Sequence, residues 1–412
     1  MMNTDIHIHT ATLPNGVRIV HKEDVSQVAY CGFAINAGTR DEEEDESGMA
    51  HFIEHMLFKG TEKRNSWHIL NRLEGVGGEI NAYTTKEETF VYSTVLTADF
   101  EKAVDLCSDI VFHPTFPSHE IEKEVDVIIE EINSYNDSPS ELIYDEFESI
   151  VFKNSQLGRN ILGDAERLQE YTTENALRFV ANNYCTDRIL FFSVGNIPFK
   201  KVMRLAEKYF GDVAAKYSTK KREKSALYVP DHVRKNLNTH QTHALIGARA
   251  YSLSDERRLP LYLLNNILGG PGMNSKLNLA VREKRGLAYT VESAYTAYSD
   301  DGLINIYFGT EHDDTEKCLH VIYKELKNLR EREMPSSQLE RAKRQLMGQL
   351  TIANENRENY ALNMAKSFLF FGMNESNSVV AEKISKITSK QLLEIANDIF
   401  EEDKLSTLIY TK

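Results

Sequence analysis

The segment HFIEH at residues 51–55 constrains the fold of this 412-residue chain more than any other. On an α-helix, side chains at positions i, i+3 and i+4 share one face. His51, Glu54 and His55 are therefore predicted to project together from a helix over residues 47–58. Two imidazoles at i and i+4 can bind one tetrahedral Zn²⁺ ion, and a carboxylate beside them is placed to take a proton from zinc-bound water. The pattern predicts a helix that carries part of a zinc centre.

The surroundings of this segment favour a helix with one buried face. The acidic run DEEEDE at residues 41–46 precedes it, and negative charge near a helix N-terminus is stabilising. Ser47 is the predicted N-cap. An apolar stripe follows, formed by Met49, Phe52, Ile53 and Met56. The alternative interpretation is an exposed helix that carries His and Glu by chance, and this context disfavours it.

A third ligand is needed, because a catalytic zinc site has three protein ligands plus water whereas a structural site is closed by four. A helix predicted over residues 118–135 offers Glu124 and Glu131, which lie seven residues apart and hence on one face. Glu131 lies beside the apolar stripe of this helix, where an unpaired carboxylate would be costly and a metal would remove the cost. The stripe consists of Ile121, Val125, Ile128 and Ile132. The pattern alone does not separate Glu131 from Glu130.

Both halves of the chain mix strands with longer helices. The expected strands are a hairpin around the turn at residues 14–16 and then residues 28–37, 89–96, 188–194, 243–250, 302–309 and 405–410. The expected helices are residues 47–58, 66–73, 100–111, 118–135, 173–183, 259–268, 315–332 and 336–355. This mixture predicts the α+β class. A duplicated fold is consistent with it, although no residue-level repeat is visible.

A basic, polar stretch without helical periodicity separates the two halves. We therefore expect a zinc-binding domain over residues 1–215, a linker over residues 216–232 and a second domain over residues 233–412. The second half has no counterpart of H-x-x-E-H, so one zinc ion per chain is expected.

Composition excludes several classes of function. The chain has 48 Lys and Arg against 62 Asp and Glu, a net charge of −14, which argues against nucleic acid as a partner. No apolar run approaches the ~18 residues that cross a bilayer, and residues 1–10 lack the features of a secretory signal or a transit peptide. The four cysteines form no C-x-x-C pair, which is typical of free thiols in a reducing compartment. We expect a cytoplasmic protein without a membrane partner.

Two further segments allow alternative interpretations. Residues 79–85, which contain Asn81, could form an exposed edge strand that accepts an extended peptide, or an ordinary interior strand. Residues 274–295 are predicted to form a helix that ends at Gly286 and a strand that begins near Tyr289. On this pattern alone, Arg282 and Tyr289 would be a helix-surface residue and a strand-packing residue.

Three segments together resemble the pitrilysin/insulysin (inverzincin) family of zinc peptidases. They are HFIEHMLFKGT at residues 51–61, NAYTTKEETFVYS at residues 81–93 and EVDVIIEEI at residues 124–132. The chain is most similar to the bacterial relatives of the mitochondrial processing peptidase β subunit. The resemblance covers essentially the whole sequence, and it implies two similar domains, each a mainly antiparallel sheet packed with helices, that form a clam-shell around a chamber.

The resemblance selects the third ligand. In the family it is a Glu about 76 residues after the second His, and Glu131 lies 76 residues after His55 (131 − 55). The companion acid, seven residues earlier, falls on Glu124, which supports the site in the family without necessarily binding metal. The implied ligands of one Zn²⁺ are His51, His55 and Glu131.

The resemblance also implies how a substrate is held. Family members have an Arg and a Tyr seven residues apart where this chain has Arg282 and Tyr289, and these reach the zinc site of the other half. By analogy they would bind substrate carbonyls and stabilise the oxyanion. The matching edge strand assigns peptide binding to Asn81, Ala82 and Tyr83.

These observations lead to one main functional hypothesis and two alternatives. The main hypothesis is a zinc metalloendopeptidase for extended or unfolded peptides, with Glu54 as general base, and family analogy points to a homodimer. The first alternative is a non-catalytic, scaffold-like member of the family, which the presence of every motif residue disfavours. The second, a purely structural zinc protein, is disfavoured because no fourth protein ligand is evident.

Overall fold

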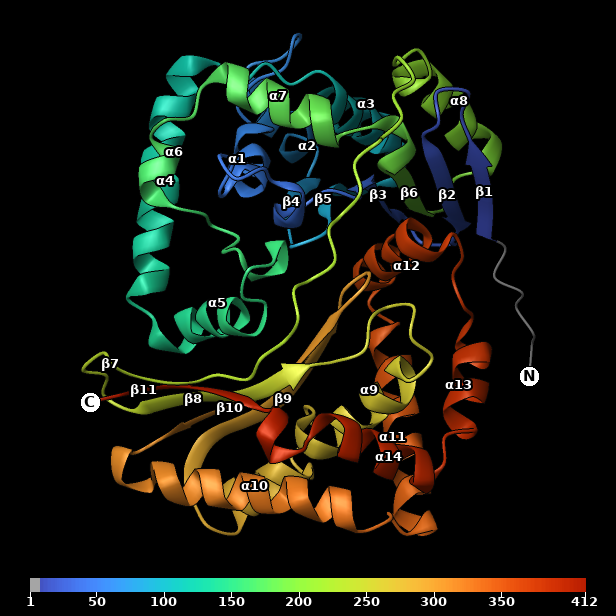
Figure 1. Cartoon of the computed structure of the whole chain (residues 1–412). Helices are drawn as coiled ribbons and strands as arrows, with labels where there is room; N and C mark the ends of the chain where they lie inside the picture. The colour runs from blue at the N-terminus through green and yellow to red at the C-terminus, as the bar shows by residue number, and fades with distance from the viewer. Residues whose placement is uncertain (1–7) are drawn as a thin grey trace. The chain divides into compact units, whose positions relative to one another are not determined.

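The structure, a computed structural model, describes residues 8–412, which form two compact units (Figure 1). Most of residues 1–10, on which the expected absence of a leader rests, lie outside the described part. Unit 1 consists of the chain up to Ile132, Asn160–Arg222 and Ala353–Asn374. Unit 2 consists of Asn133–Arg159, Glu223–Ile352 and Glu375–Lys412. Each unit has its own sheet and its own hydrophobic core.

Unit 1 is built on a six-stranded sheet. Its strands are β1 (Ile8–Thr12), β2 (Arg18–Glu23), β3 (Val28–Ile35), β4 (Glu79–Thr84), β5 (Thr89–Leu96) and β6 (Ile189–Gly195). Their order is β1-β2-β6-β3-β5-β4, and neighbours are antiparallel except β2 and β6. The helices of this unit are α1 (Met49–Met56), α2 (Ser66–Glu74), α3 (Phe100–Phe112), α4 (Ser118–Asn136, whose last residues belong to unit 2), α6 (Ala165–Leu168), α7 (Thr173–Asn183), α8 (Phe199–Phe210) and α12 (Arg357–Phe371).

The two faces of this sheet are covered by different segments, because successive side chains on a strand face opposite sides. Phe33 and Phe191 belong to the core that includes α1, α3 and α8. Ala34, Phe90 and Phe192 instead pack with α12 in a second cluster. The sheet is thus buried on both faces, and the helix on the second face comes from the end of the chain.

Unit 2 repeats this plan with five strands. They are β7 (His232–Asn236), β8 (Thr242–Arg249), β9 (Ala288–Ala297), β10 (Gly302–Thr310) and β11 (Ser406–Thr411). Their order is β7-β11-β8-β10-β9, and only β7 and β11 pair in parallel. The helices are α5 (Pro139–Val151), α9 (Arg258–Gly269), α10 (Thr315–Glu331), α11 (Ser336–Ala353), α13 (Asn377–Ser385) and α14 (Ser389–Ile399). The fold is therefore α+β with two mainly antiparallel sheets, as expected from the sequence.

The compact units differ from the contiguous domains expected over residues 1–215 and 233–412. Residues 133–159, which contain α5, belong to unit 2, and residues 353–374, which contain α12, belong to unit 1. The physical reason is that each sheet has a second apolar face that must be covered. In unit 2, α5 packs on side chains of β8, β10 and β11 in a cluster separate from the main core.

The expected linker is also more ordered than its composition indicates. Lys220 donates to the backbone of Asp41, and Arg222 donates to the Asp41 carboxylate at 2.7 Å. These residues therefore belong to unit 1, whereas strand β7 begins at His232.

The local predictions are confirmed for most elements. The strand expected over residues 89–96 is β5, and the helix expected over residues 118–135 is α4. The helix expected before Gly286 is instead a short π-helical turn, η5 (Asn278–Glu283), and Gly286 follows with a φ of 62°. All four cysteines are free and buried. Within the described part of the chain, no helix has both the length and the apolar character needed to cross a membrane.

Candidate metal centre

Helix α1 places three polar side chains together and buries its other side. His51 is only 7% exposed, and Glu54 and His55 are half-buried. The apolar stripe predicted from the sequence is fully buried in the core of unit 1, at Met49, Phe52, Ile53 and Met56. The helix is confirmed, two residues shorter at each end than expected.

The N-terminus of α1 differs from the sequence-based prediction. The N-cap is Gly48, with a φ of 82° in the left-handed region, so the prediction of Ser47 as N-cap is wrong. A Cβ at Gly48 would lie 2.7 Å from the Cα of Gly163, so both the backbone angle and the space require glycine. The cap comes from Glu42, whose carboxylate accepts hydrogen bonds from the backbone N–H of Gly48 at 3.2 Å and of Ala50 at 2.9 Å.

The acidic run therefore acts through specific contacts rather than through diffuse charge alone. Asp41, Glu42 and Glu46 are buried, whereas residues 43–45 are exposed. Asp41 accepts hydrogen bonds from Arg188 and Arg222 at 3.0 and 2.7 Å, so this buried charge is paired. No signal in the residue pattern distinguished the inward-facing carboxylates from their neighbours.

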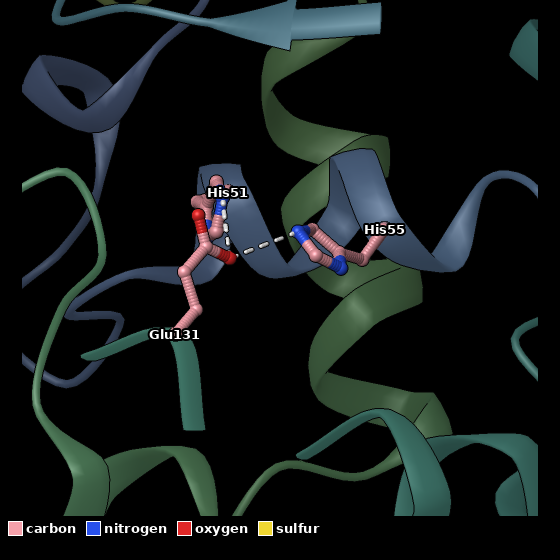
Figure 2. Close-up of side chains that lie close together, drawn as sticks. All are labelled: His51, His55 and Glu131. Atoms are coloured by element: carbon pink, nitrogen blue, oxygen red, sulfur yellow. Dashed lines mark ion pairs between the residues drawn. The ribbon is translucent and has the colours of Figure 1, made fainter. Parts of the chain in front are cut away.

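Helix α4 brings a carboxylate to the two histidines. The Oε2 atom of Glu131 lies 3.8 Å from Nε2 of His51 and 3.5 Å from Nε2 of His55. Figure 2 shows the three side chains converging, with both imidazoles on α1 and the carboxylate reaching toward them. Glu130, which the residue pattern did not separate from Glu131, is exposed. The geometry therefore distinguishes the two acids.

The donor set fits a tetrahedral zinc site. Ligand atoms about 2.0–2.1 Å from zinc lie about 3.3 Å from one another at tetrahedral angles, and the two nitrogen–oxygen distances here are slightly longer. One ligand atom from each of His51, His55 and Glu131 can be chosen so that all lie within 4.8 Å. This is the one group of three or more such residues found within residues 8–412. Two imidazoles and one carboxylate leave a fourth position for water, as in catalytic zinc sites.

Glu124 orients His55 without joining the group of three. Its Oε1 atom is 2.9 Å from Nδ1 of His55, so Nδ1 donates and Nε2 is left to face Glu131. Its Oε2 atom is 2.5 Å from the Nζ of Lys59. Lys59 was not predicted as a site residue from the sequence, although its position four residues after His55 was a signal for it.

Burial and charge shift the pKa values of the two histidines in opposite directions. Burial, together with the charge of His55, lowers the pKa of His51 to about 4, so this imidazole is neutral at pH 7 and available as a ligand. Burial also lowers the pKa of His55, but the hydrogen bond and charge of Glu124, together with the charges of Glu131 and Glu54, outweigh it, and the pKa of His55 is raised. The Nδ1 atom of His51 is buried and has no hydrogen-bond partner among the described residues.

Glu54 lies between the metal-binding group and strand β4. Burial raises the pKa of its carboxyl group, and the neighbouring Thr84 of β4 and His55 partly oppose this rise. A raised pKa makes a carboxylate a stronger proton acceptor, which suits a general base. Thr84 was not identified from the sequence.

Strand β4 lies at an edge of the sheet of unit 1 and pairs with β5 alone among the described strands. The interior-strand interpretation of residues 79–85 is therefore wrong. Asn81 is exposed, and Ala82 and Tyr83 are half-buried. The Tyr83 ring stacks on Phe90 with a centroid distance of 4.8 Å, which supports the edge from one face.

Arg282 and Tyr289 lie together in unit 2. Arg282 belongs to η5 and Tyr289 to β9, and the guanidinium lies 5.3 Å from the centroid of the tyrosine ring. Tyr289 is 81% exposed, so it does not pack in the strand's core as the pattern alone suggested. β9 is an edge strand that pairs only with β10 in the described sheet.

Comparison with known proteins identifies the family. Residues 18–165 match the model described as Insulinase (Peptidase family M16), and residues 170–346 match that of the Peptidase M16 inactive domain. An uncharacterized zinc protease of Bacillus subtilis is 33% identical over 400 residues, covering 97% of both chains. The chain belongs to peptidase family M16.

Other members of the family cover the chain equally well. An uncharacterized zinc protease of Rickettsia felis is 34% identical over 98% of this chain and 97% of its own length. The mitochondrial-processing peptidase subunit beta of Neurospora crassa is 28% identical over 97% of this chain and 87% of its own. A protease from Helicobacter pylori has the same fold, with a TM-score of 0.90 at 19% identity over 99% of this chain and all of its own. The resemblance to zinc peptidases noted from the sequence is thus confirmed.

A first experiment tests the third ligand. We expect Glu131→Ala to lose most of its bound zinc, because it removes the carboxylate that faces both Nε2 atoms, whereas Glu130→Ala keeps its zinc because Glu130 is exposed. Zinc content per chain after dialysis, measured by atomic absorption, reports the difference. Equal zinc content in the two variants would contradict the assignment of Glu131.

A second experiment tests the cap of α1. Glu42→Ala leaves two backbone N–H groups without their acceptor in a buried place. We expect a loss of about 1–3 kcal/mol in the free energy of unfolding for each buried donor left unsatisfied. Glu44→Ala, in the same acidic run but exposed, should change it by less than about 0.5 kcal/mol. Urea denaturation of both variants measures this difference. Equal free energies of unfolding in the two variants would show that Glu42 is not the cap.

Proposed function

We propose that this member of the M16 family is a zinc metalloendopeptidase that hydrolyses extended or unfolded peptides. The observation that carries the proposal is the convergence of His51, His55 and Glu131, with Glu54 on the same helix as the two histidines. The zinc protease names of its relatives support the same class of chemistry.

The residues of unit 1 have distinct roles in the proposed reaction. His51, His55 and Glu131 would hold one Zn²⁺, which supplies Lewis-acid polarisation of a water molecule and of the scissile carbonyl. Glu54 takes a proton from the attacking water as general base and then gives it to the nitrogen of the departing amine. Glu124 holds His55 through Nδ1, so that Nε2 keeps its orientation toward the ligand group.

The substrate is proposed to bind as an added strand on β4. The outer side of β4 has no strand partner among the described residues, so its backbone groups can pair with an extended peptide whatever its sequence. Asn81, Ala82 and Tyr83 provide this edge, and Thr84 at its end is near enough to Glu54 to affect the pKa of its carboxyl group. An edge that binds through backbone groups favours unfolded or extended peptides over folded domains.

Arg282 and Tyr289 are proposed to bind substrate carbonyls and to stabilise the oxyanion. Their mutual contact and the high exposure of Tyr289 leave the phenol free to donate a hydrogen bond to a ligand. We further propose that the protein is a homodimer, that it is located in the cytoplasm and that its binding partners are peptides.

The second candidate is a non-catalytic scaffold with the same fold. It would explain the fold, but it gives no reason for a half-buried Glu54 with a raised pKa beside three potential ligands. The geometry of the site therefore favours the enzyme.

The enzyme and the scaffold are separated by Glu54→Gln. Glutamine keeps the size and can still hydrogen-bond, but it cannot accept a proton at neutral pH. We expect the variant to fold, to retain zinc and to bind peptide, while hydrolysis of an unstructured peptide falls by several orders of magnitude, beyond the ~10²–10⁴-fold typical of one acid–base group, because both proton transfers are lost.

The matched control is Glu130→Gln, which makes the same chemical change at an exposed position on α4. It should keep wild-type turnover in the same fluorogenic peptide assay. If Glu54→Gln and wild type hydrolyse peptides at one rate, the activity does not come from this site, and the scaffold interpretation holds.

Tyr289→Phe tests the proposed oxyanion donor. Removal of one such donor typically costs about 10²–10³ in kcat, and we expect that loss with unchanged zinc content, since the metal ligands belong to unit 1. Tyr262→Phe removes a hydroxyl from another exposed tyrosine of unit 2 and should leave kcat unchanged. Wild-type kinetics for Tyr289→Phe would leave Tyr289 without a role in catalysis.

A further inference from the structure

Lys59 makes a contact that the proposed mechanism does not use. It lies three residues beyond the end of α1, and its backbone N–H donates to the carbonyl of Met56 at 3.1 Å, which continues the last turn. Its Nζ atom is 2.5 Å from Oε2 of Glu124. The lysine side chain is 25% exposed and that of Glu124 only 8%.

The two oxygens of Glu124 are divided between two donors. Oε1 accepts the hydrogen bond from Nδ1 of His55, and Oε2 receives the ammonium of Lys59. A carboxylate held at both oxygens cannot rotate about its terminal bond without breaking one contact. The position of Oε1, and with it the direction of the His55 ring, therefore depends on the contact at Oε2.

An exposed ion pair on the surface would not be expected to orient another side chain in this way, since exposed pairs contribute little to stability. This pair differs because the acid is buried and also bonds to a potential metal ligand. Glu124 contacts both His55 and Lys59, so Lys59 supplies its compensating charge when His55 is neutral. Removing one partner of a buried pair leaves the other uncompensated.

We propose that Lys59 is a positioning residue of the metal centre, which locks Glu124 onto Nδ1 of His55 and thereby aims Nε2 of His55 at the metal. The inference rests on the proposed function, because it assumes that His51, His55 and Glu131 bind zinc. Lys59 contacts neither a coordinating atom nor a substrate, and it acts through Glu124 alone.

The two histidines differ in a way that makes this lock necessary. His51 is held by burial in α1 itself, with 7% exposure, although its Nδ1 atom has no partner among the described residues. The side chain of His55 is 22% exposed and less confined by packing. Its orientation must therefore come from hydrogen bonding, and Glu124 with Lys59 supplies it.

The test uses the affinity of the full-length apoprotein for Zn²⁺, measured by competition with a chromophoric chelator. Lys59→Met keeps most of the volume and removes the charge. Mutation of groups that support a metal ligand typically weakens metal binding by about 10–100-fold, and we expect about tenfold here, in an apoprotein that still folds although the uncompensated Glu124 lowers its melting temperature. Lys63→Met, at an exposed position in the same loop, is the matched control and should bind zinc as the wild type does.

Two further variants exclude a merely structural role. Lys59→Arg retains the charge and should restore most of the affinity lost in Lys59→Met. In a Glu124→Gln background, where the carboxylate that Lys59 holds is gone, Lys59→Met should cause no further loss of zinc affinity. A loss that persists in this background, or wild-type affinity in Lys59→Met, would overturn the proposal.

The zinc affinities also separate this inference from the proposed function. Wild-type protein that binds zinc no more tightly than Glu131→Ala would refute the metal centre and the lock together. Tight binding that depends on Glu131 but not on Lys59 would refute the lock alone. A lock confirmed by zinc affinity in a protein without peptidase activity would leave the positioning role intact and refute only the enzyme.

Discussion

The metal centre depends on the contact between α1 and α4, made by the hydrogen bond from His55 to Glu124. Helix α1 has only eight residues, which is too short to be stable in isolation. It is fixed from outside at three places: its apolar face in the core, its N-terminus by Glu42, and its last turn by Glu124. Because the ligands come from two helices, their separation is set by these contacts rather than by either helix alone.

A buried ion pair also restricts the segments around α1 to a single arrangement. Arg40, just before the acidic run that caps α1, donates to Glu87 at 2.7 Å, and both side chains are almost fully buried. Glu87 lies in the turn between β4 and β5, so the capping segment is tied to the hairpin that carries Thr84. Buried ion pairs contribute little to stability compared with apolar replacements, yet breaking one is costly. The Arg40–Glu87 pair therefore fixes the position of α1 relative to β4, the strand proposed to bind peptide.

The sequence predicted what depends on local periodicity and missed what depends on distant contacts. The H-x-x-E-H spacing and the stripe around Glu131 predicted α1 and α4, since side-chain direction on a helix follows from spacing alone. The choice between Glu130 and Glu131 needed the family resemblance, because both flank the same stripe. Glu42 could not be predicted, because its role as a cap depends on a left-handed Gly48 and on burial that the acidic run does not suggest.

The need to cover both faces of each sheet explains why the compact units differ from the contiguous domains expected from the sequence. The chain passes between the two units five times, after residues 132, 159, 222, 352 and 374, so neither contiguous half contains a whole unit. Helix α12 covers the second face of the sheet of unit 1, where Lys366 pairs with Glu88 and Glu358 accepts a hydrogen bond from Tyr92. Glu88 and Tyr92, the partners on the sheet side, both lie on or beside the β4–β5 hairpin. The C-terminal part of the chain thus supports the strand proposed to bind substrate, and a fragment that ends at residue 215 would expose an apolar sheet face beneath that strand.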